Sequence, residues 1–172
     1  MNRASFDALY REHYPRVLGL CRRMLGSASD AEDAAQEVFM RGYRAIGRYR
    51  PGQPFGAWIG AIATNYCIDL LRRRQRWGRM FSDEPSAPEE FPDPAEHGAA
   101  SLIAAHDATA ISRAVDALPE KFRVPLVLAY YADASYDEIA TTLGITRNHV
   151  GVLLLRAKQR LRGALTEYTE EI

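Results

Sequence analysis

The chain has 172 residues, of which 47% are hydrophobic and 26% are charged, and its formal net charge is zero. This length and composition predict a soluble protein with one ordinary domain or two small ones, and the zero charge argues against a generic polycation. No apolar run approaches the 18 residues of a membrane span, and the charged N-terminal residues are not those of a signal peptide. We therefore expect a cytoplasmic protein without membrane insertion.

The zero net charge is the sum of unlike blocks. Residues 1–80 contain 14 arginines and seven acids, whereas residues 81–105 contain six acids and no base. Residues 146–166 contain five bases and no acid. Two basic blocks therefore flank an acidic one, and each basic block is a candidate for contact with phosphate.

Apolar residues recur at helical spacing over residues 5–25, and Pro15 interrupts them. This pattern predicts a helix pair or a kinked helix. Ser29 and Glu32 have the spacing of a capping box, so the next helix is expected to span residues 30–46.

The helix expected over residues 30–46 has two distinct faces. A predicted core stripe, widened by Phe39 and Tyr43, consists of Ala31, Ala35, Val38, Gly42 and Ile46. A second face consists of Asp33, Gln36, Glu37 and Met40. The spacing alone leaves open whether this second face binds a partner or is simply solvated.

A Pro/Gly corner at residues 50–54 separates this helix from a second amphipathic helix that begins near Phe55 and runs into an arginine cluster at residues 72–76. Arginines interleaved with Tyr49, Tyr66 and Trp77 are suited to unpaired nucleic acid, because guanidinium groups bind phosphate and aromatic rings stack on bases. A solvated arginine run is an equally good interpretation of the composition.

Residues 81–103 are acidic and rich in proline, which predicts a flexible linker. A second helical domain is expected to follow, with a helix through Ile103, Ile111, Val115 and Leu118 and another that Pro119 opens. Cys21 and Cys67 lie within helical patterns, and we expect them to be buried and reduced.

Residues 135–162 carry the most specific local pattern. Ser135 and Glu138 form a second capping-box signature, Gly144 is placed to end that helix, and Thr146 is placed to cap the next one. The final helix carries basic residues without one acid, which favours a DNA-binding helix-turn-helix over an unrelated helical hairpin.

Taken together, these segments resemble the extracytoplasmic-function sigma factors of bacterial RNA polymerase, in the sigma-70 family. The resemblance rests on the stretches at 6–14, 30–39 and 55–59, on Asn65 and Asp69, and on the stretches at 118–119 and 135–140. It implies an all-α fold of two small helical domains joined by a flexible acidic linker. Sigma domain 2 would span residues 1–80, the linker 81–103, and sigma domain 4 with its helix-turn-helix 104–172.

The resemblance also implies partners and site residues. The partners would be core RNA polymerase, through the clamp helices of its largest subunit and the flap of its beta subunit, promoter DNA and an anti-sigma factor. Contact with core polymerase would involve Asp33, Gln36, Glu37 and Met40. The minus-ten element would be bound by Arg41, Ala45, Tyr49, Arg50, Gln53, Phe55, Trp58, Asn65, Arg72, Arg73, Arg74 and Arg76. The minus-thirty-five element would be bound by Arg147, Asn148, His149, Arg156, Lys158 and Arg160.

One departure from the family pattern concerns the final helix. The family usually places basic residues where this chain has Gly151 and Leu153, which predicts weaker or unusual recognition of the upstream element. Leu155 could instead pack against a partner.

Two other hypotheses compete with the sigma factor. They are a helix-turn-helix regulator that binds duplex DNA without replacing another sigma, and an adaptor that has lost affinity for DNA. No catalytic residues, metal site or cofactor are expected, because the four histidines lack metal-ligand spacing and no phosphate-binding glycine loop or nucleophile motif occurs.

Overall fold

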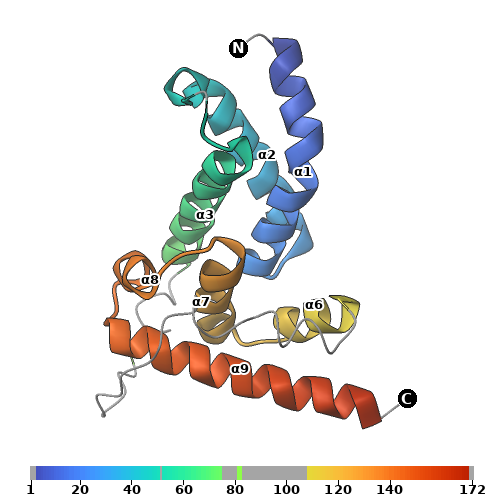
Figure 1. Cartoon of the computed structure of the whole chain (residues 1–172), viewed down its shortest axis with the longest axis vertical. Coiled ribbons are helices and arrows are strands. Elements are labelled where there is room, and N and C mark those ends of the chain that lie inside the picture. Colours follow the sequence, from blue (N-terminus) through green and yellow to red (C-terminus); the bar gives the residue numbers. More distant parts are fainter. Residues whose placement is uncertain (1–2, 51, 75–80, 83–107, 171–172) are drawn as a thin grey trace. The chain divides into compact units, whose positions relative to one another are not determined.

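The computed structural model describes residues 3–50, 52–74, 81–82 and 108–170, and these residues divide into two compact helical units, within 1–77 and 78–172. Helices are the only regular secondary structure in these ranges (Figure 1). The predicted all-α fold with two domains is therefore confirmed. The predicted domain limits at residues 80 and 103 lie outside the described residues and stay predictions.

The first unit consists of α1 (Arg3–Leu25), α2 (Ala28–Ala45), the short 3-10 helix η1 (Ile46–Arg48) and α3 (Phe55–Arg73). Each of the three long helices packs against the other two. Pro15 lies inside α1 without ending it, so the predicted helix pair is excluded. Because Pro15 is exposed, water can bind the carbonyl group that loses its helical hydrogen bond there.

The start of α2 differs from the expected one. Its N-cap is Ser27 rather than Ser29, and the Ser27 hydroxyl oxygen accepts a hydrogen bond from the Asp30 amide at 3.4 Å. Gly26 has a left-handed φ of 72°, which reverses the chain immediately after α1. The new helix therefore starts two residues earlier than predicted, and the Ser29–Glu32 capping box was wrong.

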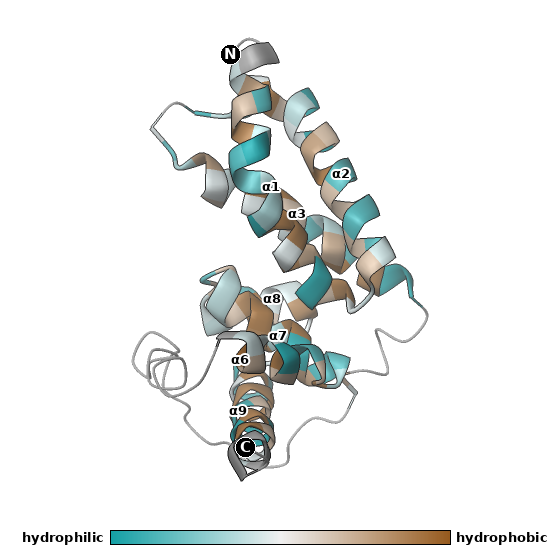
Figure 2. Cartoon of the chain, turned by 90° about the vertical axis from the view of Figure 1, so that its right-hand side faces the viewer, coloured by the Kyte–Doolittle hydropathy of each residue, from teal (hydrophilic) through white to brown (hydrophobic). Residues whose placement is uncertain are grey.

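The core of the first unit lies among α1, α2 and α3, and α2 approaches α3 most closely at Gly42. A Cβ atom on Gly42 would lie 2.7 Å from Cδ1 of Ile59, so glycine permits this close approach. Ala31, Ala35 and Val38 are fully buried, as the predicted stripe requires. Tyr43 is 50% exposed, which corrects its assignment to the core. Hydrophobic and hydrophilic residues alternate along α2 (Figure 2).

Cys21 on α1 and Cys67 on α3 are fully buried free thiols, as predicted. A hydrogen bond from Cys67 lowers the pKa of Cys21. The same bond, together with burial, raises the pKa of Cys67. Among the described residues, no cluster of three or more His, Cys, Asp or Glu side chains is arranged to hold a metal ion. The two thiols therefore belong to the α1–α3 packing.

The second unit consists of α6 (Ala108–Asp116), α7 (Glu120–Tyr131), α8 (Tyr136–Leu143) and α9 (Arg147–Glu170). Helix α9 packs against the other three. The buried Arg123 donates hydrogen bonds to the carbonyl oxygens of Asp116 at 3.3 Å and Leu118 at 3.0 Å, which ties the turn after α6 to α7. Residues 101–107, which include the predicted helix position Ile103, lie outside the described residues. No helix in the described ranges combines the length and apolar character that crossing a bilayer requires.

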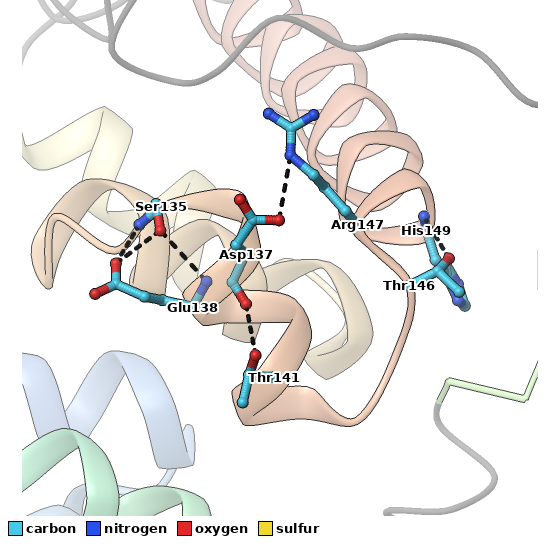
Figure 3. Close-up of polar contacts among 7 residues, drawn as sticks. All are labelled: Ser135, Asp137, Glu138, Thr141, Thr146, Arg147 and His149. Carbon is cyan, nitrogen blue, oxygen red and sulfur yellow. Dashed lines mark hydrogen bonds and ion pairs between the residues drawn. The ribbon is translucent and has the colours of Figure 1, made fainter.

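Helices α8 and α9 form the predicted helix-turn-helix. The Ser135–Glu138 capping box is present, with the Ser135 amide and hydroxyl both donating to Glu138 Oε2 at 2.8 Å. Gly144 ends α8 with a left-handed φ of 71°. The Thr146 hydroxyl oxygen accepts a hydrogen bond from the His149 amide at 3.2 Å (Figure 3). These three predictions are confirmed.

The capping box makes the second unit sensitive to acid. Hydrogen bonds from the Ser135 backbone and side chain lower the pKa of Glu138. A carboxylate with a lowered pKa contributes stability above its unfolded pKa, and that stability is lost as the pH falls through the folded value. We expect the melting temperature to fall between about pH 5 and pH 3. Glu138→Gln, which keeps the hydrogen bonds but does not titrate, should show a smaller fall; an unchanged fall in circular dichroism melts would contradict this.

Candidate nucleic-acid interface

One exposed face of α2 carries the four residues that were predicted to bind polymerase. Asp33, Gln36 and Met40 are exposed, and the Glu37 side chain is 34% exposed. Met40 also borders an open hollow of about 630 Å³ between α1 and α2, lined by Phe6, Asp7, Tyr10, Gln36, Phe39, Met40 and Tyr43. The structure therefore brings these four residues together around a partly apolar surface.

Arg41 lies between this face and α3. Its Nε atom donates a hydrogen bond to Glu37 Oε1 at 2.8 Å, and its guanidinium carbon lies 4.4 Å from the centroid of the Tyr66 ring. One arginine therefore contacts both a predicted polymerase-binding residue and an aromatic ring of the predicted strand-binding helix. Sequence reasoning did not find this link, because Glu37 and Arg41 were assigned to different partners.

The corner between α2 and α3 is held by aromatic rings. The Tyr49 hydroxyl donates to the Gln53 carbonyl at 2.6 Å, and the Tyr49 ring lies 5.3 Å from Trp58 and 5.6 Å from Phe55, centroid to centroid. Phe55 is 6% exposed, so it supports the corner from beneath. Tyr49 and Trp58 are half-buried, whereas Arg50 and Gln53 are exposed at the corner.

The remaining predicted minus-ten residues have different surroundings. Asn65 on α3 is exposed, and Ala45 is half-buried at the end of α2. Arg72 and Arg73 are exposed in the last turn of α3, whereas Arg76 lies outside the described residues.

Arg74 differs from its neighbours. Its Nη2 atom lies 2.6 Å from Asp30 Oδ2, and its Nη1 atom donates to the Leu25 carbonyl oxygen at 3.3 Å. It therefore links the end of α3 to the turn between α1 and α2.

Arg73 and Arg74 form a matched pair for a test. We expect Arg74→Ala to destabilise the first unit by about 1 kcal/mol, because a charge-assisted hydrogen bond to a backbone carbonyl is lost. Arg73→Ala should leave stability unchanged. It should reduce the slope of the logarithm of the single-strand binding constant against the logarithm of the salt concentration by about 0.7, because one phosphate contact is lost. Urea denaturation and salt titrations of binding measure the two effects, and equal stability of the two variants would contradict the structural role of Arg74.

The predicted minus-thirty-five residues divide by burial. Arg147 and Arg156 are exposed, Asn148 is half-buried, and His149 is 4% exposed. Figure 3 shows Arg147 reaching from α9 toward α8, where its Nε atom lies 3.4 Å from Asp137 Oδ1. His149 therefore contributes to the packing of the helix-turn-helix, which its polar side chain did not suggest.

A basic hollow of about 470 Å³ lies between α7 and α9. It is lined by Lys121, Phe122, Arg156, Gln159 and Arg160. The Phe122 ring lies 4.8 Å from the Arg160 guanidinium carbon and 5.2 Å from Lys121 Nζ. Lys158 lies apart, with its Nζ atom 5.6 Å from the Tyr130 ring. Lys121 is a candidate phosphate contact that sequence reasoning missed, because it lies 35 positions before Arg156 and only the fold joins them.

Two sigma-70 family models match the chain, one in each unit. Residues 9–77 match sigma-70 region 2, and residues 108–161 match sigma-70 region 4. The ECF RNA polymerase sigma factor SigE of Mycolicibacterium smegmatis is 36% identical over 97% of this chain, which spans 64% of that relative. The ECF RNA polymerase sigma factor SigL of Mycobacterium tuberculosis is 32% identical over 95% of this chain and 90% of its own length.

A solved structure shows the same fold. The sigma factor RpoE of Bartonella quintana, in complex with the anti-sigma factor NepR, matches with a TM-score of 0.56 and 19% identity. The match covers 94% of this chain and 97% of that one.

Proposed function

Since this chain belongs to the extracytoplasmic-function sigma factors of the sigma-70 family, we propose that it directs promoter-specific transcription initiation and that its two units divide that task. The first unit binds the clamp helices of core polymerase and captures the melted minus-ten strand. The second unit binds the minus-thirty-five element and the flap of the beta subunit.

The exposed surface of α2 carries this proposal. Asp33, Gln36 and Glu37 lie on one face of it, and Arg41 connects that face to Tyr66 on α3. A duplex-binding regulator has no use for an acidic face beside an arginine and aromatic surface. A subunit that must hold polymerase and a DNA strand together needs both on one rigid element.

Strand capture is a binding process and requires no catalysis by this chain. Opening a duplex costs about 1.4 kcal/mol per stacked step, and extruding a base costs a few kcal/mol more. Tyr49 and Trp58 can offset this cost by stacking, and Asn65 can hydrogen-bond an extruded base. Arg72 and Arg73 would bind the strand backbone. Because Phe55 and the hydroxyl of Tyr49 fix the corner, little conformational freedom is lost on binding.

Upstream binding would use phosphate contacts at the edges of the helix-turn-helix. Arg147 and Arg156 lie on α9, and Lys121 and Arg160 line the hollow beside it. Among the described residues that line this hollow there is no carboxylate, so its three cations attract a phosphate backbone. His149 would act by packing rather than by touching DNA.

An anti-sigma factor is the third partner that we propose. The hollow between α1 and α2 has the exposed apolar residues Met40 and Tyr43 at its edge, and a bound helix could cover them together with the polymerase-binding face. Because core polymerase is found in the cytoplasm, the chain would act there.

The proposed function is tested by mixing the purified chain with sigma-free core polymerase and a genomic DNA library and mapping the RNA starts. We expect starts that require the chain and share one upstream motif. Core binding without starts would indicate a missing activator. If core binding and dependent starts were both absent, the sigma function would be excluded and a duplex-binding regulator would remain.

A further inference from the structure

The outward face of the first turns of α9 is apolar at its centre. His149, Val150, Gly151, Leu153 and Leu154 are buried and cannot reach a bound ligand. In residues 148–155 the side chains on the outward face are Val152 and Leu155, which lie roughly 60° apart at 100° per residue, and Asn148 lies between them with its Oδ1 atom buried. Leu155 is 41% exposed and Val152 is half-buried. This surface therefore presents two aliphatic side chains where the helix-turn-helix would meet DNA.

Cations lie around this centre rather than in it. Arg147 is drawn toward α8 by Asp137 and by the Tyr136 ring, whose centroid lies 5.6 Å from its guanidinium carbon. Arg156 lies one turn after Val152, at the entrance of the basic hollow that Lys121 and Arg160 also line. The arrangement suits a duplex, in which the base edges of the major groove lie between two phosphate backbones.

The chemistry of the base edges indicates which base this surface fits. Guanine is recognised by arginine or lysine through O6 and N7, and no cation lies at the centre of this face. The C5-methyl group of thymine is the apolar feature of the major groove. We propose that Val152 and Leu155 recognise thymines of the minus-thirty-five element through their methyl groups.

This proposal rests on the proposed function, because it assigns the base contacts of the same upstream site. The competing occupant of Leu155 is an apolar protein surface. DNA is the better fit, because the aliphatic patch consists of two side chains and cations border it on more than one side. A protein partner would require a larger continuous apolar area.

The test uses the full chain bound to core polymerase and the promoter identified by start mapping. Each thymine of the upstream element is replaced in turn by deoxyuridine, which removes the methyl group and keeps the base-pairing groups. We expect about a fourfold loss of promoter affinity at one or two positions, which corresponds to one buried methyl group each. On the thymine promoter, Leu155→Ala or Val152→Ala should weaken promoter binding by a similar factor. At the base position that the replaced residue contacts, each variant should bind the thymine and deoxyuridine promoters equally well.

Thr166→Ala, which changes an exposed residue of α9 outside the hollow and outside the proposed base contacts, is the matched control and should keep the discrimination. If every deoxyuridine promoter bound as well as the thymine one, while RNA starts still required the chain, this inference would be wrong and the sigma function would stand. If Leu155→Ala weakened core binding and left thymine discrimination unchanged, Leu155 would be a protein contact, which also overturns the inference. The absence of any chain-dependent start would instead remove the sigma function.

Discussion

A chain in which Asp33, Gln36 and Glu37 are all replaced by alanine is expected to bind core polymerase at least about a hundredfold more weakly. The three side chains share one exposed face of α2, so they would leave water together when a partner covers them. Alanine favours the helix, and none of the three residues is in the core, so the fold should be retained. The loss of affinity would therefore reflect lost contacts with core polymerase and not unfolding of the chain.

The measurement is a titration of fluorescently labelled chain with core polymerase, followed by start mapping with the same variant. Glu12→Ala is the matched control, because it removes an exposed charge from α1 and leaves the face of α2 unchanged. The control should bind core polymerase like the unmodified chain. Unchanged affinity of the triple variant would show that polymerase binds elsewhere on the chain.

Local sequence signals predicted the second unit best. Ser135, Glu138, Gly144 and Thr146 act through neighbours no more than four residues away, so the pattern of the chain is sufficient to locate them. The start of α2 was placed two residues too late because Ser27 and Ser29 are both acceptable caps. The left-handed turn at Gly26 decides between them, and it depends on how α1 ends.

The site residues were harder to predict, because their surroundings come from other helices. Arg74 lies in an arginine run, yet its partner Asp30 is 44 positions away. Phe55 was predicted to touch DNA from its residue type, and spacing alone did not predict that it is buried beneath the corner. Residue type and spacing predicted which segments carry charge and rings. They could not predict which side chains the packing of three helices leaves exposed.

The second large effect is expected from Ile139→Ala in the helix-turn-helix. Ile139 is completely buried, and truncating a buried isoleucine typically costs about 2–5 kcal/mol through lost apolar burial and a residual cavity. A small domain is stable by only about 5–15 kcal/mol, so this change removes a large part of the stability of the second unit. We expect much faster amide hydrogen exchange in α7, α8 and α9.

Thr141→Ala is the matched control, because Thr141 is exposed on the same helix and its hydroxyl donates to the Asp137 carbonyl at 2.9 Å. It should change stability by less than about 0.5 kcal/mol. Promoters that depend on the upstream element should lose activity with Ile139→Ala and keep it with Thr141→Ala, because only the first change loosens the contact between α8 and α9. Equal hydrogen exchange in the two variants would show that Ile139 does not hold these helices together, whereas loss of activity without faster exchange would indicate an altered DNA contact.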